Sequence, residues 1–150
     1  MNDKTLSFLV MCLLIDGAAN AVDSHKQADD VGLPEVASRT YAQNYKDLAL
    51  STCIAQAYAG EPKAVADAGA TAGGLESTWT NYDVEKGGGE IQKLVDHYLK
   101  RQYNSIQGPD IKLDLLKCLD MYHSKELEAQ VRRYVPNSNR TYKQENPPSK

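Results

Sequence analysis

The sequence predicts an all-α fold, a small bundle of about five helices with one disulfide bond. Three observations support this prediction. No segment alternates polar and apolar side chains for long enough to form a strand, and β-branched residues are scarce. Apolar residues instead recur at three- and four-residue steps, the spacing of one face of a helix. Two of the three cysteines lie in these helical segments, where they can form one bridge.

Residues 1–21 are predicted to be a secretory signal peptide. A short polar head that contains Lys4 leads into an apolar run from Phe8 to Ile15, and the segment ends in the Ala-Asn-Ala pattern of a cleavage site. The run is too short to span a membrane permanently, so no membrane anchor is expected. The alternative is a buried N-terminal helix, which is disfavoured because Asp16 and Gly17 would interrupt it.

Cleavage after this segment leaves enough chain for one domain. We expect residues 22–38 to form an N-terminal extension, 39–135 the helical domain and 136–150 a disordered tail, because the last segment is polar and contains prolines. The net charge is −3, and no basic cluster is interleaved with aromatic residues, which argues against nucleic acid as a partner.

The cysteines allow two interpretations. Export would remove Cys12 and leave Cys53 and Cys118 in an oxidising compartment, where they can pair. The alternative is a thiol enzyme in which Cys118 acts with His123. Five residues along a continuous helix amount to about 500°, so these side chains would point about 140° apart. No orienting third group or set of oxyanion donors is evident either. We therefore expect a structural disulfide and no catalytic residue.

The first two helices are predicted at residues 39–59 and 62–79. Gly60 and Pro62 separate them. The second helix is rich in alanine and glycine, with Gly69 and Gly73 four residues apart on one face. Small residues at this spacing allow two helix backbones to approach closely, so we expect helix packing there rather than a phosphate loop.

The third helix carries the clearest amphipathic pattern. Asp83 is a candidate N-cap, but Gly87–Gly89 are poor helix formers, so the helix is expected either to start late, at Glu90, or to have a loose first turn. Its apolar stripe consists of Ile91, Leu94, Val95, Tyr98 and Leu99.

Two more helices are predicted after the turn-rich segment that follows. One runs from about Asp110 to Tyr122, and Ser124 can cap the last one, which Pro136 ends. The apolar side of the fourth helix is expected to comprise Ile111, Leu115, Cys118, Leu119 and Tyr122. That of the fifth is expected to comprise Leu127, Val131 and Tyr134.

No metal site or cofactor is expected. The three histidines, His25, His97 and His123, are scattered, and their spacing matches no common ligand motif. Carboxylates occur at the ordinary spacing of exposed helix surfaces, which singles out no acid/base pair. A small-ligand-binding helical domain stays open as an alternative, and it would require an apolar pocket.

Four segments together resemble a known family, the type VI secretion amidase immunity proteins that are paired with the fourth class of amidase effectors. The segments are residues 39–58, 67–88, 91–103 and 113–135, and the most specific pieces read YKD with a following STC, DAG with a run of small residues, and LLKCLDMYHSKEL. The glycine run and the tail depart from the pattern.

The resemblance implies a periplasmic, all-helical inhibitor of a cognate peptidoglycan amidase. Such amidases resemble papain-like cysteine hydrolases and cut the γ-D-glutamyl to meso-diaminopimelate bond. The resemblance also implies a homodimer in a two-plus-two assembly, and a protruding loop that fills the cleft of the enzyme. The family cysteines correspond to Cys53 and Cys118.

Two segments are candidates for that loop. The first is polar and stiffened by a Gly-Pro pair, and its last residue offers a carboxylate: Asn104, Ser105, Ile106, Gln107, Gly108, Pro109 and Asp110. Its alternative is a plain interhelical turn. The second offers aromatic anchors, either of which could equally be core: Trp79, Tyr82, Asp83 and Glu85. For a dimer, the face of Gly69 and Gly73 or an exposed part of the stripe at 91–99 is expected.

Overall fold

The computed structural model describes residues 33–147, and this part of the chain forms one compact helical unit without strands. The predicted all-α fold is therefore confirmed. The signal peptide and most of the predicted extension fall outside the described residues. In chain order the elements are η1 (Glu35–Ser38), α1 (Tyr41–Ala57), α2 (Pro62–Gly74), η2 (Leu75–Trp79), α3 (Val84–Leu99), α4 (Asp114–Tyr122), α5 (Lys125–Tyr134) and α6 (Tyr142–Glu145).

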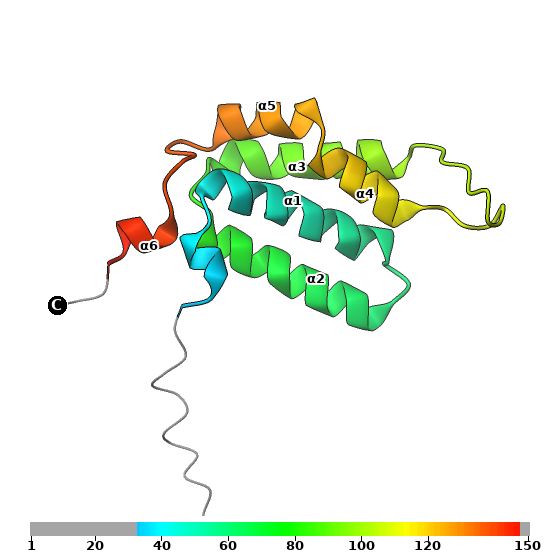
Figure 1. Cartoon of the computed structure of the whole chain (residues 1–150), viewed down its shortest axis with the longest axis horizontal. Coiled ribbons are helices and arrows are strands. Elements are labelled where there is room, and N and C mark those ends of the chain that lie inside the picture. The colour runs from blue at the N-terminus through cyan, green and yellow to red at the C-terminus, as the bar shows by residue number, and fades with distance from the viewer. Residues whose placement is uncertain (1–32, 148–150) are drawn as a thin grey trace, which may run out of the picture. The chain divides into compact units, whose positions relative to one another are not determined.

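Helix α1 is the centre of the bundle. It contacts α2, α3, α4 and α5, and Figure 1 shows it between α2 on one side and α3 on the other. Its buried face consists of Tyr41, Asn44, Tyr45, Leu48, Ala49 and Cys53. From α3 the core receives Ile91, Leu94, Val95 and Tyr98, so the predicted stripe is confirmed as the buried face of that helix.

The N-terminus of α1 is capped by the C-terminal segment of the chain. The first two amides of the helix, those of Tyr41 and Ala42, donate to the carbonyls of Arg140 and Ser138 at 2.8 and 3.0 Å. The Thr40 side chain accepts from the next free amide. Helix N-termini expose amides without intrahelical partners, and here these amides find backbone acceptors from the far end of the sequence.

The prediction of a disordered tail is wrong for residues 136–147. Helix α6 lies in this segment and begins with a capping box at Thr141. Tyr142 packs against Trp79 with their ring centroids 4.9 Å apart, and the Tyr41 hydroxyl donates to Glu145 at 2.7 Å. Residues 148–150 lie outside the described part. The segment is polar in composition, but these tertiary partners order it.

The N-terminal boundary of the domain also differs from the prediction. The compact unit begins at Leu33, and η1 belongs to it with a buried Ala37. Residues 33–38, assigned to an extension on sequence grounds, pack against α6 instead. A short segment that buries one alanine has too weak a periodicity to be recognised from sequence.

Helix α3 starts at Val84, so the predicted late start at Glu90 is wrong. Asp83 caps the helix as expected, accepting from the Lys86 amide at 3.2 Å. The glycine run is therefore helical. A Cβ on Gly87 would lie 3.0 Å from the Tyr82 ring and 3.1 Å from the Tyr134 Cβ. Any larger residue would crowd these two tyrosines, which pack directly on the backbone, and this explains a glycine inside the helix.

Helix α2 is packed less tightly than the sequence suggests. None of its residues is buried, and a Cβ built on Gly69 or Gly73 would meet no atom within 4 Å. The expectation that these glycines allow a close helix approach is therefore wrong. Leu75 in the following η2 supplies the buried contact of this region.

Helix α4 begins later than predicted, at Asp114, after Leu113 in the left-handed region with φ of 54°. The predicted apolar face is only partly buried. Cys118 is fully buried, but Leu115 and Leu119 are exposed, and so is Ile111 in the preceding loop. Helix α5 agrees with the prediction, with Ser124 as its cap.

Candidate functional site

The connection between α3 and α4, residues 100–113, projects from one end of the bundle (Figure 1). It contains the whole of the first predicted binding segment, 104–110. Ile106 is fully exposed at 103% of its reference area, the highest value among the large apolar side chains that the structure describes. An apolar side chain that the fold leaves in water is a candidate contact for a partner.

Internal hydrogen bonds shape this loop. The Gln107 amide donates to the Ser105 hydroxyl at 3.1 Å, and the Ile111 amide donates to the Gly108 carbonyl at 3.2 Å. Pro109 fixes one further backbone angle between these turns. A Cβ built on Gly108 would meet the Ile111 side chain at 3.5 Å, so that side chain lies next to the turn at Gly108.

The base of the loop is anchored on α4. Tyr103 donates a hydrogen bond from its hydroxyl to Asp120, which raises the pKa of Tyr103. The buried Lys117 donates to the Leu99 carbonyl at 3.3 Å and to Asp114 at 2.7 Å. Sequence reasoning missed Lys117, because a lysine three residues after an aspartate on a helix normally indicates an exposed pair.

A disulfide joins Cys53 of α1 to Cys118 of α4. Both cysteines are fully buried. The predicted bridge is confirmed, and the thiol-enzyme alternative is not favoured because the Cys118 sulfur is bonded to Cys53. His123 ends α4 and packs edge-on against Tyr122, with ring centroids 5.1 Å apart.

The second predicted binding segment has roles within the fold. Tyr82 is 7% exposed and donates to Glu76 at 2.8 Å, and Trp79 packs against Tyr142. Both rings thus fit the core alternative that the sequence left open for them. Asp83 caps α3, whereas the Glu85 side chain is exposed.

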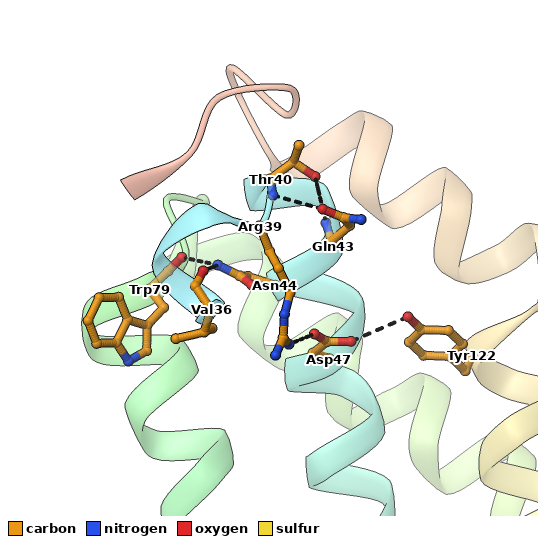
Figure 2. A network of polar contacts seen from close by, with 8 residues as sticks. All are labelled: Val36, Arg39, Thr40, Gln43, Asn44, Asp47, Trp79 and Tyr122. Carbon is orange, nitrogen blue, oxygen red and sulfur yellow. Dashed lines mark hydrogen bonds and ion pairs between the residues drawn. The ribbon is translucent and has the colours of Figure 1, made fainter. Parts of the chain in front are cut away.

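A polar network next to this segment links four elements. Figure 2 shows the Asn44 amide between the carbonyls of Val36 and Trp79, to which it donates at 3.1 and 2.7 Å. In the same view Asp47 accepts from Arg39 and from the Tyr122 hydroxyl. The contacts join η1, α1, η2 and α4, so the network is structural.

An open groove of about 590 Å³ lies between α1 and α2. Its walls carry Arg39, Asp47 and Asp67 beside Leu50 and Trp79. This mixture of charges differs from the apolar pocket that a small-ligand-binding domain would need.

Among the described residues, no group of three His, Cys, Asp or Glu side chains is placed to hold a metal ion. No helix in that part of the chain is long and apolar enough to cross a membrane.

The fold and the loop define a class of protein. A small helical domain uses its cysteines as a covalent tie between helices and presents one internally bonded loop beyond the bundle. These are the properties of a protein that acts by binding another molecule.

The comparisons agree with this class. The model of the Tai4 family, described as type VI secretion system amidase immunity protein, matches residues 43–131. The chain therefore belongs to the Tai4 family of amidase immunity proteins. Members of this family are inhibitors, not enzymes.

Two solved structures are similar over most of the chain. One, described as "New Type VI-secreted toxins and self-resistance proteins in Serratia marcescens", is 32% identical with a TM-score of 0.69, and the match covers 77% of this chain and 94% of that one. The other, from the effector–immunity system Tae4/Tai4 of Salmonella typhimurium, is 25% identical with a TM-score of 0.61, and the match covers 68% and 96%. No curated protein matches the sequence.

Proposed function

We propose that this immunity protein binds its cognate peptidoglycan amidase in the periplasm and blocks the active-site cleft with residues 104–110. The observation that carries the proposal is the loop itself, which projects from the bundle and exposes Ile106 completely. An inhibitor of this kind only has to exclude substrate, so it needs a protrusion that fits a groove and no chemistry of its own.

The rigidity of the loop supports tight binding. Ordering a flexible loop on binding costs about 0.5–1.5 kcal/mol for each immobilised side chain, and this cost is avoided where the conformation exists beforehand. The turns at Ser105 and Gly108 and the anchor at Tyr103 hold the free loop in shape. Most of the interaction energy is then available for affinity.

The side chains of the loop suit the expected cleft. The amidase cuts a bond between residues that carry free carboxylates, so its cleft is built to accept acidic peptides. Asp110 offers such a carboxylate on an exposed side chain, and Ile106 can be buried against the cleft wall. The second segment, 79–85, lies at the N-terminal end of α3, whereas the loop follows its C-terminal end. A helix of this length is about 24 Å long, so the two segments lie far apart. We assign the cleft to the first segment alone.

We also propose that the protein acts as a homodimer in a two-plus-two assembly. Four of the five residues of the stripe on α3 are buried in the monomer and Leu99 is only partly buried, so little of the stripe is available for a dimer contact. A better surface is the exposed apolar groove between the end of α1, the end of the loop and α4, lined by Tyr58, Ile111, Leu115, Leu116 and Leu119. Leu119→Glu should convert a dimer to a monomer in sedimentation velocity, whereas an unchanged sedimentation coefficient would exclude this face.

A periplasmic location requires export. We propose cleavage after residue 21, and the intact mass of protein purified from the periplasmic fraction tests it. A mass that includes the first 21 residues would contradict the proposal.

The loop is tested with a matched pair of substitutions. Ile106 and Val84 are both exposed apolar residues, one in the loop and one at the start of α3. The amidase is recovered by pull-down from producing cells, and its hydrolysis of peptidoglycan fragments is measured with each variant. Ile106→Asp should weaken inhibition at least tenfold, as expected for a buried anchor, and Val84→Asp should not.

Deletion of Ser105–Gly108 should weaken inhibition more than either single substitution. The shortened protein should keep its melting temperature and lose inhibition. Full inhibition by the folded deletion variant would eliminate the loop as the plug. Loss of inhibition with Val84→Asp but not with Ile106→Asp would point to the second segment instead.

A further inference from the structure

Lys117 is the charged residue that is most thoroughly buried in the described part of the chain. Its side chain is 7% exposed, although lysine is almost never buried without partners. The ammonium group has three partners. It donates to the Leu99 carbonyl at 3.3 Å and to Asp114 Oδ1 at 2.7 Å, and it lies 6.0 Å from the centroid of the Tyr103 ring.

These partners come from three different parts of the α3–α4 connection. Leu99 is the last residue of α3, Tyr103 lies within the loop and Asp114 is the first residue of α4. The last carbonyls of a helix lack intrahelical donors, and a lysine ammonium group satisfies them well. One buried cation thus joins the place where the chain leaves the bundle, the loop, and the place where the chain returns.

The helix that carries Lys117 is itself held firmly. The next residue, Cys118, is bonded to Cys53, which is buried in the C-terminal half of α1. The ammonium group is therefore fixed relative to the core, and a loop that bonds to it has a defined direction. Removal of the charge would leave the disulfide in place and release only the base of the loop.

We propose that Lys117 is the positioning residue for the inhibitory loop, which its ammonium group holds in the conformation that enters the amidase. This inference rests on the proposed function of residues 104–110. Lys117 is buried, so it touches no amidase atom and acts through Leu99, Tyr103 and Asp114. Its loss lowers the fraction of molecules with a competent loop, and the apparent affinity falls by that same fraction.

The kinetic consequence distinguishes positioning from contact. A smaller competent fraction lowers the association rate constant, whereas the contacts of the bound state and the dissociation rate constant are retained. The proposal is tested with Lys117→Met, which keeps the apolar stem and removes the charge. Lys125→Met is the control, since it removes the same charge from an exposed side chain of α5.

Association and dissociation of the cognate amidase are measured by surface plasmon resonance. Lys117→Met should lower the association rate constant about tenfold and change the dissociation rate constant less than about twofold, as expected if one molecule in ten is competent. Lys117→Arg keeps a cation at this place and should restore most of the loss. Lys125→Met should match the wild type. Amide hydrogen exchange in residues 100–113 should be faster with Lys117→Met than in the wild type, and unchanged with Lys125→Met.

A second variant covers the case in which Lys117→Met does not fold. Asp114→Asn removes the carboxylate that accepts from Lys117 and should lower the association rate constant about threefold, by the same reduction in competent fraction. Unchanged association with the folded Lys117→Met, or with Asp114→Asn if that variant alone folds, overturns the proposal. The proposed function stands in that case, provided that the Ser105–Gly108 deletion still abolishes binding. Unchanged binding by the deletion overturns both.

Discussion

Cys53 and Cys118 are bonded to each other in the interior, and the bond ties the C-terminal half of α1 to α4, the helix that follows the 100–113 connection. The two residues are 65 positions apart in the chain. The closed loop includes α2, η2, α3 and the whole α3–α4 connection. The disulfide thus constrains more than half of the described domain. It also fixes α4, the helix that follows the loop, relative to α1.

Loss of the disulfide should lower the free energy of unfolding by about 4 kcal/mol, because a loop of this length regains its chain entropy in the unfolded state. The double variant Cys53→Ser/Cys118→Ser tests this by urea denaturation. The unsubstituted protein, denatured without reductant, should take up no alkylating label on these cysteines. Two labels would show that the thiols are free and would contradict the structure.

The glycines at the start of α3 should respond in opposite ways to alanine. Gly87→Ala places a methyl group against Tyr82 and Tyr134 and should destabilise the protein by about 1–3 kcal/mol, as overpacking does. Gly89 has no atom within 4 Å of the new Cβ, so Gly89→Ala should stabilise the helix by about 1 kcal/mol. Thermal unfolding of both variants is the measurement, and equal shifts would contradict the packing described here.

Removal of residues 136–150 should destabilise the domain. The deletion takes away the carbonyls that cap α1 and the ring that packs on Trp79, contributions of about 1–3 kcal/mol together. A deletion of residues 148–150 alone leaves all these contacts in place and serves as the control. If both truncations melted at the same temperature, the tail would have no structural role.

Stability should fall at alkaline pH because of buried tyrosines. Burial, and then the hydrogen bond to Glu145, raises the pKa of Tyr41 to about 12. Burial also raises the pKa of Tyr45 and Tyr82. A pKa that is higher in the folded state than in the unfolded state contributes stability that is complete below pH 10 and is lost as the pH rises towards 12 and beyond.

Denaturant unfolding between pH 9 and pH 12 tests this dependence. The free energy of unfolding should stay constant to about pH 10 and then decline. Tyr41→Phe should reduce the slope of the decline. A stability that rose across this range would contradict the burial of these hydroxyl groups.

Local patterns were sufficient to predict the parts of the fold that depend on neighbours in sequence. The stripe on α3 and the caps at Asp83 and Ser124 follow from spacing and side-chain chemistry. The pairing of Cys53 with Cys118 followed from counting cysteines after export. The segment 104–110 could be selected because a Gly-Pro pair between two helices indicates a defined turn.

The features that the sequence did not predict depend on distant partners. Gly87 is helical because Tyr134, from another helix, covers it. The tail is ordered because its backbone carbonyls accept hydrogen bonds from the first amides of α1. Leu115 has the spacing of a core residue but is exposed, since α4 turns only one narrow face inwards. Lys117 has no sequence signal, because its significance comes from where α3 ends.

The mode of inhibition tests the central claim most directly. Amidase activity on a peptidoglycan peptide is measured at several concentrations of the immunity protein and across a wide range of substrate concentration. If the loop occupies the cleft, inhibition is competitive: KM rises with inhibitor concentration and kcat is unchanged. A lowered kcat at saturating substrate, with KM unchanged, would show that the inhibitor and the substrate bind at the same time and would contradict the account.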